Sequence, residues 1–530
     1  MSRTKSKGQL AKNSEKQPSN PWPAPVEKAA RATPRSRLVG RITPIALALA
    51  GGALLSFHWI YEADFWWHLA QGREIAAGRL VTTNLFSGTY PNYPQPFTSW
   101  LFELGAYGVW KMAGAAGIQV GQALVIALTL ALVYFACRHR ATVPLVLAIE
   151  ALGLFLIEPR AVPRPHLVSL MMMAACTLLV ERARASRTAT PLLWAIPLIA
   201  LWSNTHAESL FGAAYIGIFA AGEFLHPEVL SRHRAWIALT IAAAGTVANM
   251  ANPYGTGLFR YLWENANASE VVQIAEFRPA YLPVYAPFFA YLVCGAALLL
   301  LRWRKVTLWE MLVFGSFGFL ALRHVRFTSL FFCVSAPIVA ARLADTRARI
   351  AKGPILVPAM LLIGMLLSPV PFARRFQQLG IGSNYLEPRD LLSPGANAFI
   401  RSAALTGPVF NSNNLGGYLA WNLYPDVHIF QDGRFQAYPP KFFANIHQAY
   451  QSQPDWDRLV AGVDWAVLSL HRSGPLSGAG RFPREQWTPI YVDRAVAIVV
   501  RRSGKFGALA VKHGHVRLPG ITGLMVGSRP

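Results

Sequence analysis

Residues 42–69 read ITPIALALAGGALLSFHWIYEADFWWHL, and this stretch determines the fold class that we expect. Residues 42–60 form an apolar run close to the length that crosses a bilayer as a helix. Two carboxylates, Glu62 and Asp64, follow the run at once, and the tryptophans after them are typical of a membrane interface. The stretch therefore predicts a membrane helix that ends in an acidic and aromatic segment.

The composition of the whole chain supports a membrane protein. Of the 530 residues, 53% are hydrophobic and 14% are charged, whereas soluble domains average about 25% charged residues. This balance excludes a secreted disulfide scaffold, a disordered chain and a soluble nucleic-acid-binding protein, so we expect no nucleic acid partner. The formal net charge of +24 needs another explanation.

Apolar runs recur along the chain and predict about eleven membrane helices. They cover residues 42–60, 116–137, 141–157, 166–180, 190–203, 208–224, 235–250, 284–301, 307–322, 327–341 and 354–370. Together they predict a polytopic all-α membrane domain over residues 42–370, with a long first loop over residues 61–115.

The basic residues decide the orientation of this domain, because cytoplasmic loops are enriched in Lys and Arg. With the N-terminus inside, the cytoplasmic loops carry 14 Lys and Arg in 41 residues, and the opposite loops carry 9 in 108. We therefore expect residues 1–41 to be a disordered, basic cytoplasmic tail and loop 61–115 to lie outside. Residues 371–530 alternate short β-like runs with turns, which predicts a small extracytoplasmic α/β domain.

Polar and ionisable residues gather on the outer side in this topology. Such groups near the hydrocarbon are costly unless they pair or line a wet cavity, so they indicate a functional site. They are Glu62, Asp64, His68, Glu158, Arg160, Arg164, His166, Asn204, His206, Glu208, Asn252, Tyr254, Glu276, Arg278, Arg323, His324 and Arg326. Alternatives stay open: Arg160 and Arg164 could snorkel to the interface, and His206 and His324 could be structural histidines.

The pair Glu62 and Asp64 has three interpretations. Carboxylates two residues apart can share a divalent cation such as Mg²⁺ or Mn²⁺. One of them can instead act as a general base beside an acceptor hydroxyl. They can also cap the amphipathic helix that we expect over Phe65–Ala77. The motif alone does not choose among these interpretations.

With its Glu-x-Asp motif in the first outer loop, about eleven spans and an outward C-terminal domain, the chain resembles the GT-C superfamily of polyprenyl-phosphate-sugar-dependent glycosyltransferases. That superfamily includes protein O-mannosyltransferases, the aminoarabinose transferases of lipid A and the catalytic subunit of oligosaccharyltransferase. Further motifs are similar to a group of bacterial membrane proteins labelled GT-C-like. They are Asp64–Gly72, Trp202–His206, Asn252–Gly255, Glu276–Pro279, Arg323–Arg326, Asn414–Tyr418 and Gln431–Arg434.

The resemblance implies roles for individual residues. It implies that the catalytic residues are Asp64, Glu62 and His68. It also implies that Glu62 and Asp64 are the candidate metal ligands. The residues expected to bind the donor phosphate are Arg323, Arg326, Arg160 and Arg164. The residues expected to line the cavity are His206, Asn204, Glu276, Arg278, His324, Asp432 and Arg434. The polar, glycine-rich cluster of the C-terminal domain is expected to face that cavity, and it comprises Asn411, Asn413, Asn414, Gly416, Gly417, Asp432 and Arg434.

The resemblance also implies a function. It predicts an integral-membrane glycosyltransferase of the bacterial cytoplasmic membrane, which moves a sugar from a polyprenyl-phosphate donor to an envelope glycan, lipid or protein acceptor on the extracytoplasmic face. The partners are then the lipid-linked donor, the acceptor and membrane lipids. Two alternatives remain: a non-catalytic component of a polysaccharide assembly system, and a transporter of lipid-linked sugars. A transporter would place its charged groups near the bilayer midplane and on both sides.

Overall fold

The fold is taken from a computed structural model of the chain, which describes residues 34–58, 60, 62–267, 275–346, 356–367, 393–471 and 473–516. Most of the expected tail 1–41 lies outside these residues. The chain forms two compact units, residues 1–43 and 44–530, and the second contains the features described below. Helices predominate up to residue 367, and a mixed sheet follows after residue 393.

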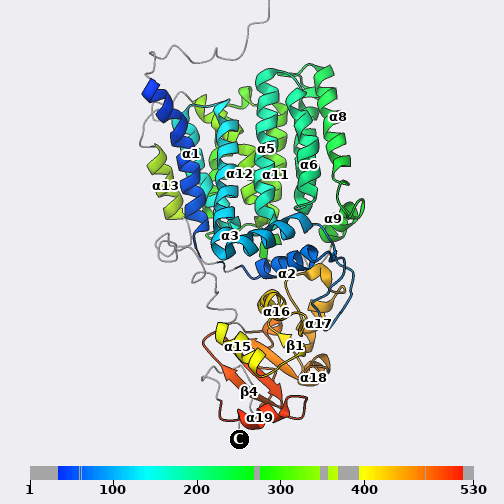
Figure 1. The fold of residues 1–530 in the computed structure, drawn as a ribbon. Coiled ribbons are helices and arrows are strands. Elements are labelled where there is room, and N and C mark those ends of the chain that lie inside the picture. Colours follow the sequence, from blue (N-terminus) through cyan, green and yellow to red (C-terminus); the bar gives the residue numbers. More distant parts are fainter. Residues whose placement is uncertain are drawn as a thin grey trace, which may run out of the picture. The chain divides into compact units, whose positions relative to one another are not determined.

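Each of the eleven predicted apolar segments contains a helix, and Figure 1 shows α5, α6, α11 and α12 side by side in a bundle. The helices are α1 (Pro34–Ser56), α3 (Trp100–Arg138), α4 (Val143–Ile157), α5 (Pro165–Ser186), α6 (Ala195–Ser203), α7 (Leu210–Leu225), α8 (Arg232–Ala248), α10 (Ala286–Leu301), α11 (Leu308–Arg323), α12 (Thr328–Ala344) and α13 (Leu356–Leu367).

Length and apolar composition qualify four helical stretches of the described chain as candidate membrane spans. They are Trp100–Arg138, Pro165–Ser186, Ala207–Leu225 and Val325–Ala344. Three shorter apolar helices cover Thr43–Ser56, Thr190–Ser203 and Ala286–Leu301. The chain is thus a mostly helical protein with several apolar spans, and the number of eleven crossings stays a prediction.

Helix α12 forms the centre of the bundle. All of its residues from Thr328 to Arg342 are buried, and a helix that is apolar on every side belongs inside a bundle. Neighbouring helices approach closely at glycines: a methyl group on Gly153 of α4 would overlap the ring of Phe332. This packing fixes the helix ends that carry the polar residues described below.

The first long loop contains more helix than the hydrophobic pattern predicts. Helix α2 (Asp64–Ala76) agrees with the expected amphipathic helix, but α3 begins at Trp100 and not near residue 116. The reason is a kink at Gly114, which has φ +55° and ψ −142°, a conformation that glycine adopts without strain. The loop before α3 therefore ends at residue 99, and residues 100–113 form a helical segment that the kink separates from the apolar helix after it.

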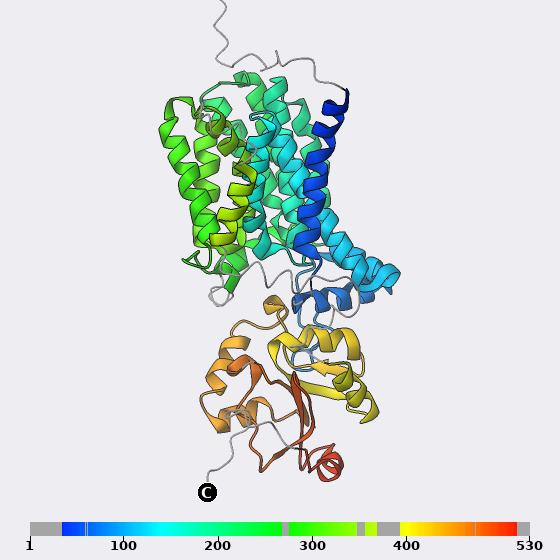
Figure 2. The same ribbon diagram turned by 90° about the vertical axis from the view of Figure 1, so that its left-hand side faces the viewer.

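The C-terminal residues form a five-stranded sheet in the order β2-β1-β3-β5-β4. Strand β1 pairs in parallel with β2 and β3, and β5 pairs antiparallel with β3 and β4. The strands are β1 (Gly407–Asn411), β2 (Val427–Ile429), β3 (Trp465–Ser469), β4 (Trp487–Val492) and β5 (Val496–Arg501). The helices are α15 (Pro394–Ser402), α16 (Gly416–Leu423), α17 (Phe442–Ala449), α18 (Gln453–Leu459) and α19 (Gly507–Lys512). Figure 2 shows this small α/β domain in yellow to red.

The first loop and helix α2 pack directly on the C-terminal domain. The backbone N–H of Ile429 donates to the carbonyl of Phe86 at 2.9 Å, and the N–H of Gly88 donates to the carbonyl of Ile429 at 2.8 Å. A side chain at Gly417 of α16 would press on the backbone of Ala63 and Trp67, so the glycine permits close contact between α16 and α2. These contacts hold β2 against the first loop and α16 against the start of α2.

Candidate active site

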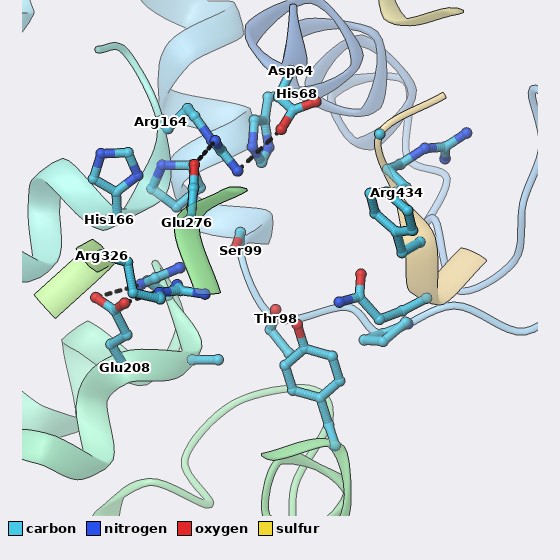
Figure 3. A pocket seen from close by; sticks show the side chains of 18 of the residues that line it. Asp64, His68, Thr98, Ser99, Arg164, His166, Glu208, Glu276, Arg326 and Arg434 are labelled. Atoms are coloured by element: carbon cyan, nitrogen blue, oxygen red, sulfur yellow. Dashed lines mark hydrogen bonds and ion pairs between the residues drawn. The ribbon is translucent and has the colours of Figure 1, made fainter. Parts of the chain in front are cut away.

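A cavity of about 940 Å³ lies where the start of α2, the start of α5 and the C-terminal domain meet. Its wall also includes the segment 95–99 and the turns η3 (Ala207–Ser209), η5 (Ala275–Phe277) and η7 (Val325–Phe327). Figure 3 shows ionisable side chains projecting into this space from elements that are far apart in the sequence. The cavity is therefore the candidate site to which the predicted residues can be compared.

One wall of the cavity is built around Arg164, the residue that precedes α5. Its Nη1 atom lies 2.6 Å from Oε1 of Glu276 and 3.7 Å from Oε1 of Glu62, and its Nη2 atom lies 3.0 Å from Oδ2 of Asp64. Arg160 reaches the other oxygen of Glu276, with Nη1 2.8 Å from Oε2. Two arginines and three carboxylates thus form one connected cluster.

A second ionic group lies on the same wall. Nη2 of Arg326 is 2.9 Å from Oε1 of Glu208, and the guanidinium lies 4.5 Å from the centre of the Phe277 ring. Nδ1 of His206 is 3.3 Å from Glu208 and 2.8 Å from the hydroxyl of Ser169. Glu208 therefore lies between a guanidinium group and an imidazole ring.

Helix α2 presents Asp64 and His68 to the cavity from one face, because residues four apart in a helix lie above one another. The N-cap position of α2 is Ala63, which makes no side-chain capping bond, and the backbone N–H of Asp64 donates to Glu62 at 3.4 Å. Among the described residues the principal polar contact of the Asp64 carboxylate is thus Arg164. Gly433 lies so close that a side chain there would overlap Oδ1 of Asp64.

His68 forms a buried pair with a residue that the sequence reasoning missed. Its Nδ1 atom lies 3.1 Å from Oε1 of Glu103 in the first turn of α3, and both side chains line the cavity. An isolated glutamate inside the aromatic and aliphatic stretch Trp100–Val109 is the signal that could have identified it. Glu103 fixes the orientation of the imidazole beside Asp64.

Burial and Arg164 act in opposite directions on the acidic groups. Burial raises the pKa of Asp64 and Glu62, and the positive charge of Arg164 offsets this only in part. Burial alone would also raise the pKa of Glu276, but Arg160 and Arg164 outweigh it and hold that pKa well below its usual range. Burial, reinforced by Arg164, lowers the pKa of His68, so its imidazole is neutral at pH 7.

The opposite wall of the cavity carries neutral polar side chains. They are Gln95, Thr98, Ser99, Asn413, Asn414 and Gln436. The one cation of this wall, Arg434, is held by Asp432 at 2.6 Å, by Gln95 at 3.0 Å and by Asn84 at 2.9 Å. Arg434 therefore ties the first loop to the C-terminal domain, and this wall has little net charge.

No protein-family model and no curated protein matches this sequence. Solved structures do match. The oligosaccharyltransferase of Archaeoglobus fulgidus in the apo form has a TM-score of 0.52 at 12% identity, over 81% of this chain and 70% of that chain. AglB from Archaeoglobus fulgidus, in complex with an inhibitory peptide and a dolichol-phosphate, has a TM-score of 0.51 at 12% identity, over 82% of this chain and 70% of that chain.

A third structure matches almost along its whole length. ArnT from Cupriavidus metallidurans, bound to undecaprenyl phosphate, has a TM-score of 0.50 at 13% identity, over 88% of this chain and 99% of that chain. These neighbours are members of the GT-C superfamily. The chain has the GT-C fold. At such low identity the likeness concerns the fold, and the roles of residues rest on the geometry above.

In this GT-C fold many of the predicted site residues come together at the cavity. Asp64, Glu62 and His68 line it, as do Arg160, Arg164, Arg326, His206, Glu276, His324 and Arg434. From the glycine-rich cluster, Asn413 and Asn414 also reach the wall.

Other predicted residues do not reach the cavity. Arg323 is exposed at the last residue of α11, whereas Arg326 lies in the next turn and points inward, so the phosphate role predicted for Arg323 has no support. Arg278 is also exposed, one residue after η5. Asn204 instead accepts from the indole N–H of Trp100 at 2.8 Å, and Asp432 is fully buried beneath Arg434. Asn411 braces its own domain by donating to the carbonyl of Gln431.

In this structure the carboxylates that could share a divalent cation are paired with Arg164. Among the described residues no group of three or more His, Cys, Asp or Glu side chains is arranged to hold a metal ion. Arg164 instead supplies the positive charge beside Asp64, Glu62 and Glu276. A guanidinium in this position fills the role that a shared cation would have, so we derive no step through a metal.

Proposed function

We propose that the chain is an integral-membrane glycosyltransferase that moves a sugar from a polyprenyl-phosphate donor to a hydroxyl of an envelope glycan, lipid or protein. The proposal places the reaction on the extracytoplasmic face of the bacterial cytoplasmic membrane. It is supported most by one observation: of the four arginines that line the cavity with Asp64, three lie on the charged wall, namely Arg160, Arg164 and Arg326. The GT-C neighbours bound to dolichol-phosphate and to undecaprenyl phosphate support the class of donor.

The arginines have the chemistry that the donor phosphate needs. A guanidinium binds phosphate oxygens through two parallel N–H bonds, and it stabilises the negative charge that grows as the phosphate leaves. Arg164 and Arg160 both lie on the side of the cavity that holds Asp64, and both contact the carboxylate of Glu276. A phosphate bound by these arginines would leave the anomeric carbon near Asp64.

Asp64 is the proposed general base. The acceptor hydroxyl attacks the anomeric carbon, a new carbon–oxygen bond forms, the bond from that carbon to the phosphate oxygen breaks, and the phosphate leaves with the electron pair. The hydroxyl proton passes to the Asp64 carboxylate, and a single displacement of this kind inverts the anomeric centre. Glu62 is its acidic partner. Glu103 orients His68 one helical turn away, where the neutral imidazole can hydrogen-bond the acceptor.

The substitution Asp64→Asn tests this role. Asparagine keeps the size of aspartate and an oxygen that can still accept from Arg164, so a purely structural Asp64 would change Tm and leave turnover per folded molecule near that of wild type. A base would not, and we expect turnover of a polyprenyl-phosphate-linked sugar to fall by something on the order of a hundredfold or more. Asp426→Asn, at an exposed position before β2, is the matched control. An Asp64→Asn protein that turns over donor as fast as wild type would favour the transporter or the non-catalytic component.

A further inference from the structure

The arginines of the charged wall already hold carboxylates in the position where a phosphate would bind. Glu276 places one oxygen 2.6 Å from Arg164 and the other 2.8 Å from Arg160, so a single carboxylate bridges two guanidinium groups. A phosphate group offers the same arrangement of two oxygens to two arginines. The donor phosphate and Glu276 therefore compete for the same N–H donors.

We propose that Glu276 holds the place of the donor phosphate, so that donor binding displaces its carboxylate and Glu276 sets the affinity for the lipid-linked donor. This inference rests on the proposed function and adds to it a residue that controls donor binding. Figure 3 shows the Glu276 carboxylate beside the Arg164 guanidinium, on the cavity side.

Glu276 is the most exposed acid of the charged wall. Its side chain is 26% exposed, against 21% for Glu62, 20% for Asp64 and 9% for Glu208. Its backbone is fixed, because His324 Nδ1 lies 2.7 Å from the carbonyl of Phe277 and the N–H of Val325 donates to the carbonyl of Arg278. The side chain can therefore turn into the cavity while the η5 segment stays in place.

Displacement also changes the charge balance of the wall. While Glu276 is bound, the three carboxylates Glu62, Asp64 and Glu276 oppose the charges of the two arginines. A phosphate that takes over Arg160 and Arg164 replaces one of these negative groups without leaving either guanidinium unpaired. A neutral residue at position 276 would bind the two guanidinium groups more weakly and would remove a negative charge that repels an incoming phosphate.

The test is Glu276→Gln, which keeps the shape of the side chain and removes its charge. We expect the Kd for a short polyprenyl phosphate in detergent to fall by about tenfold relative to wild type. A merely structural Glu276 would give weaker or unchanged binding. Glu264→Gln, on the exposed face of α9 (Gly257–Asn267), is the matched control and should bind like wild type. Inorganic phosphate forms a second arm, and the variant should also bind it more tightly if the headgroup alone is recognised.

Thermal unfolding shows whether the Glu276→Gln variant has a folding defect. If Glu276→Gln lowers Tm, the polyprenyl phosphate should restore more of that Tm than it adds to wild type, because the ligand replaces the missing carboxylate. If wild type binds the polyprenyl phosphate and the variant binds it equally or more weakly, Glu276 does not occupy the phosphate position, and the proposed function is unaffected. No binding of the lipid phosphate to wild type overturns both.

Discussion

Helix α5 carries an arginine–carboxylate cluster at each end: one lines the cavity, and the side chains of the other are buried. The cavity cluster consists of Glu62, Asp64, Arg160, Arg164 and Glu276. The sealed cluster consists of Arg140, Glu181, Arg184, Glu310 and Arg342. Both clusters consist of arginines and carboxylates. The difference in their exposure therefore distinguishes a structural ion-pair network from a candidate binding site.

The sealed cluster is closed to ligands by packing. Arg140 contacts Glu181 through two bonds of 2.7 and 2.8 Å and also pairs with Glu310, whose side chain is fully buried. The guanidinium groups of Arg140 and Arg184 lie 5.3 and 5.0 Å from the ring centre of Trp309. In the cavity cluster the carboxylates are 20 to 26% exposed. Ion pairs that border a wet cavity can exchange partners, whereas these buried ones hold helices together.

The largest expected effect is on stability, from Arg140→Met. The change leaves the carboxylates of Glu181 and Glu310 buried without their main partner, which typically costs about 3–5 kcal/mol. Thermal unfolding in detergent should show a large fall in Tm or a loss of folded protein. Turnover per folded molecule should stay close to that of wild type. A well-folded Arg140→Met protein with no turnover would make the sealed cluster functional and favour a transporter.

An arginine-to-methionine substitution in the cavity cluster should instead lower turnover strongly and stability only a little. Arg164→Met removes a cation proposed to bind the leaving phosphate, and we expect turnover to fall by about a hundredfold, which corresponds to about 2.7 kcal/mol in the barrier. The carboxylates left behind can be solvated from the cavity, so Tm should fall less than in Arg140→Met. Steady-state kinetics and unfolding of both variants check the contrast. Equal losses of Tm with unchanged turnover would contradict it.

A smaller effect is expected from Gly433→Ala in the C-terminal domain. The added methyl group would overlap Oδ1 of Asp64 and push the carboxylate aside, and a displacement of this kind should lower turnover by about tenfold. Gly462→Ala is the control, because nothing lies near its methyl position. Wild-type turnover in Gly433→Ala would mean that the C-terminal domain does not position the base.

The smallest effect is expected from removal of divalent cations. Arg164 supplies the positive charge beside Glu62 and Asp64, so EDTA should leave turnover of the purified protein unchanged. A loss of turnover in EDTA that Mg²⁺ or Mn²⁺ restores would reinstate the cation-binding interpretation of the pair.

Most of the helical architecture could be predicted from the sequence, because long apolar runs have few alternatives to a membrane helix. The start of α3 could not, since residues 100–113 are less uniformly apolar and the kink at Gly114 depends on backbone geometry. In the C-terminal domain the β-like runs at residues 407–410, 427–431, 465–470 and 495–501 predict strands β1, β2, β3 and β5. Strand β4, with Pro489 inside it, was not predicted.

The candidate site was predictable in part, because alternate loops of the helical domain carry its polar residues to one end of the bundle. Which arginine turns inward depends on where α11 ends, so the motif Arg323–Arg326 could not distinguish Arg326 from Arg323. The pairing of Glu276 with Arg160 and Arg164 joins segments more than a hundred residues apart, as does the contact of Gly433 with Asp64. Neither is encoded in local spacing.

The most direct test of the account is a structure of the protein with an added polyprenyl phosphate, determined by electron cryomicroscopy. We expect density for the phosphate within hydrogen-bond distance of Arg164 and Arg160, with the Glu276 carboxylate displaced and Asp64 facing the position of the sugar. Phosphate density elsewhere, with Arg164 still paired to Asp64 and Glu276, would contradict the assignment of this cavity as the donor site.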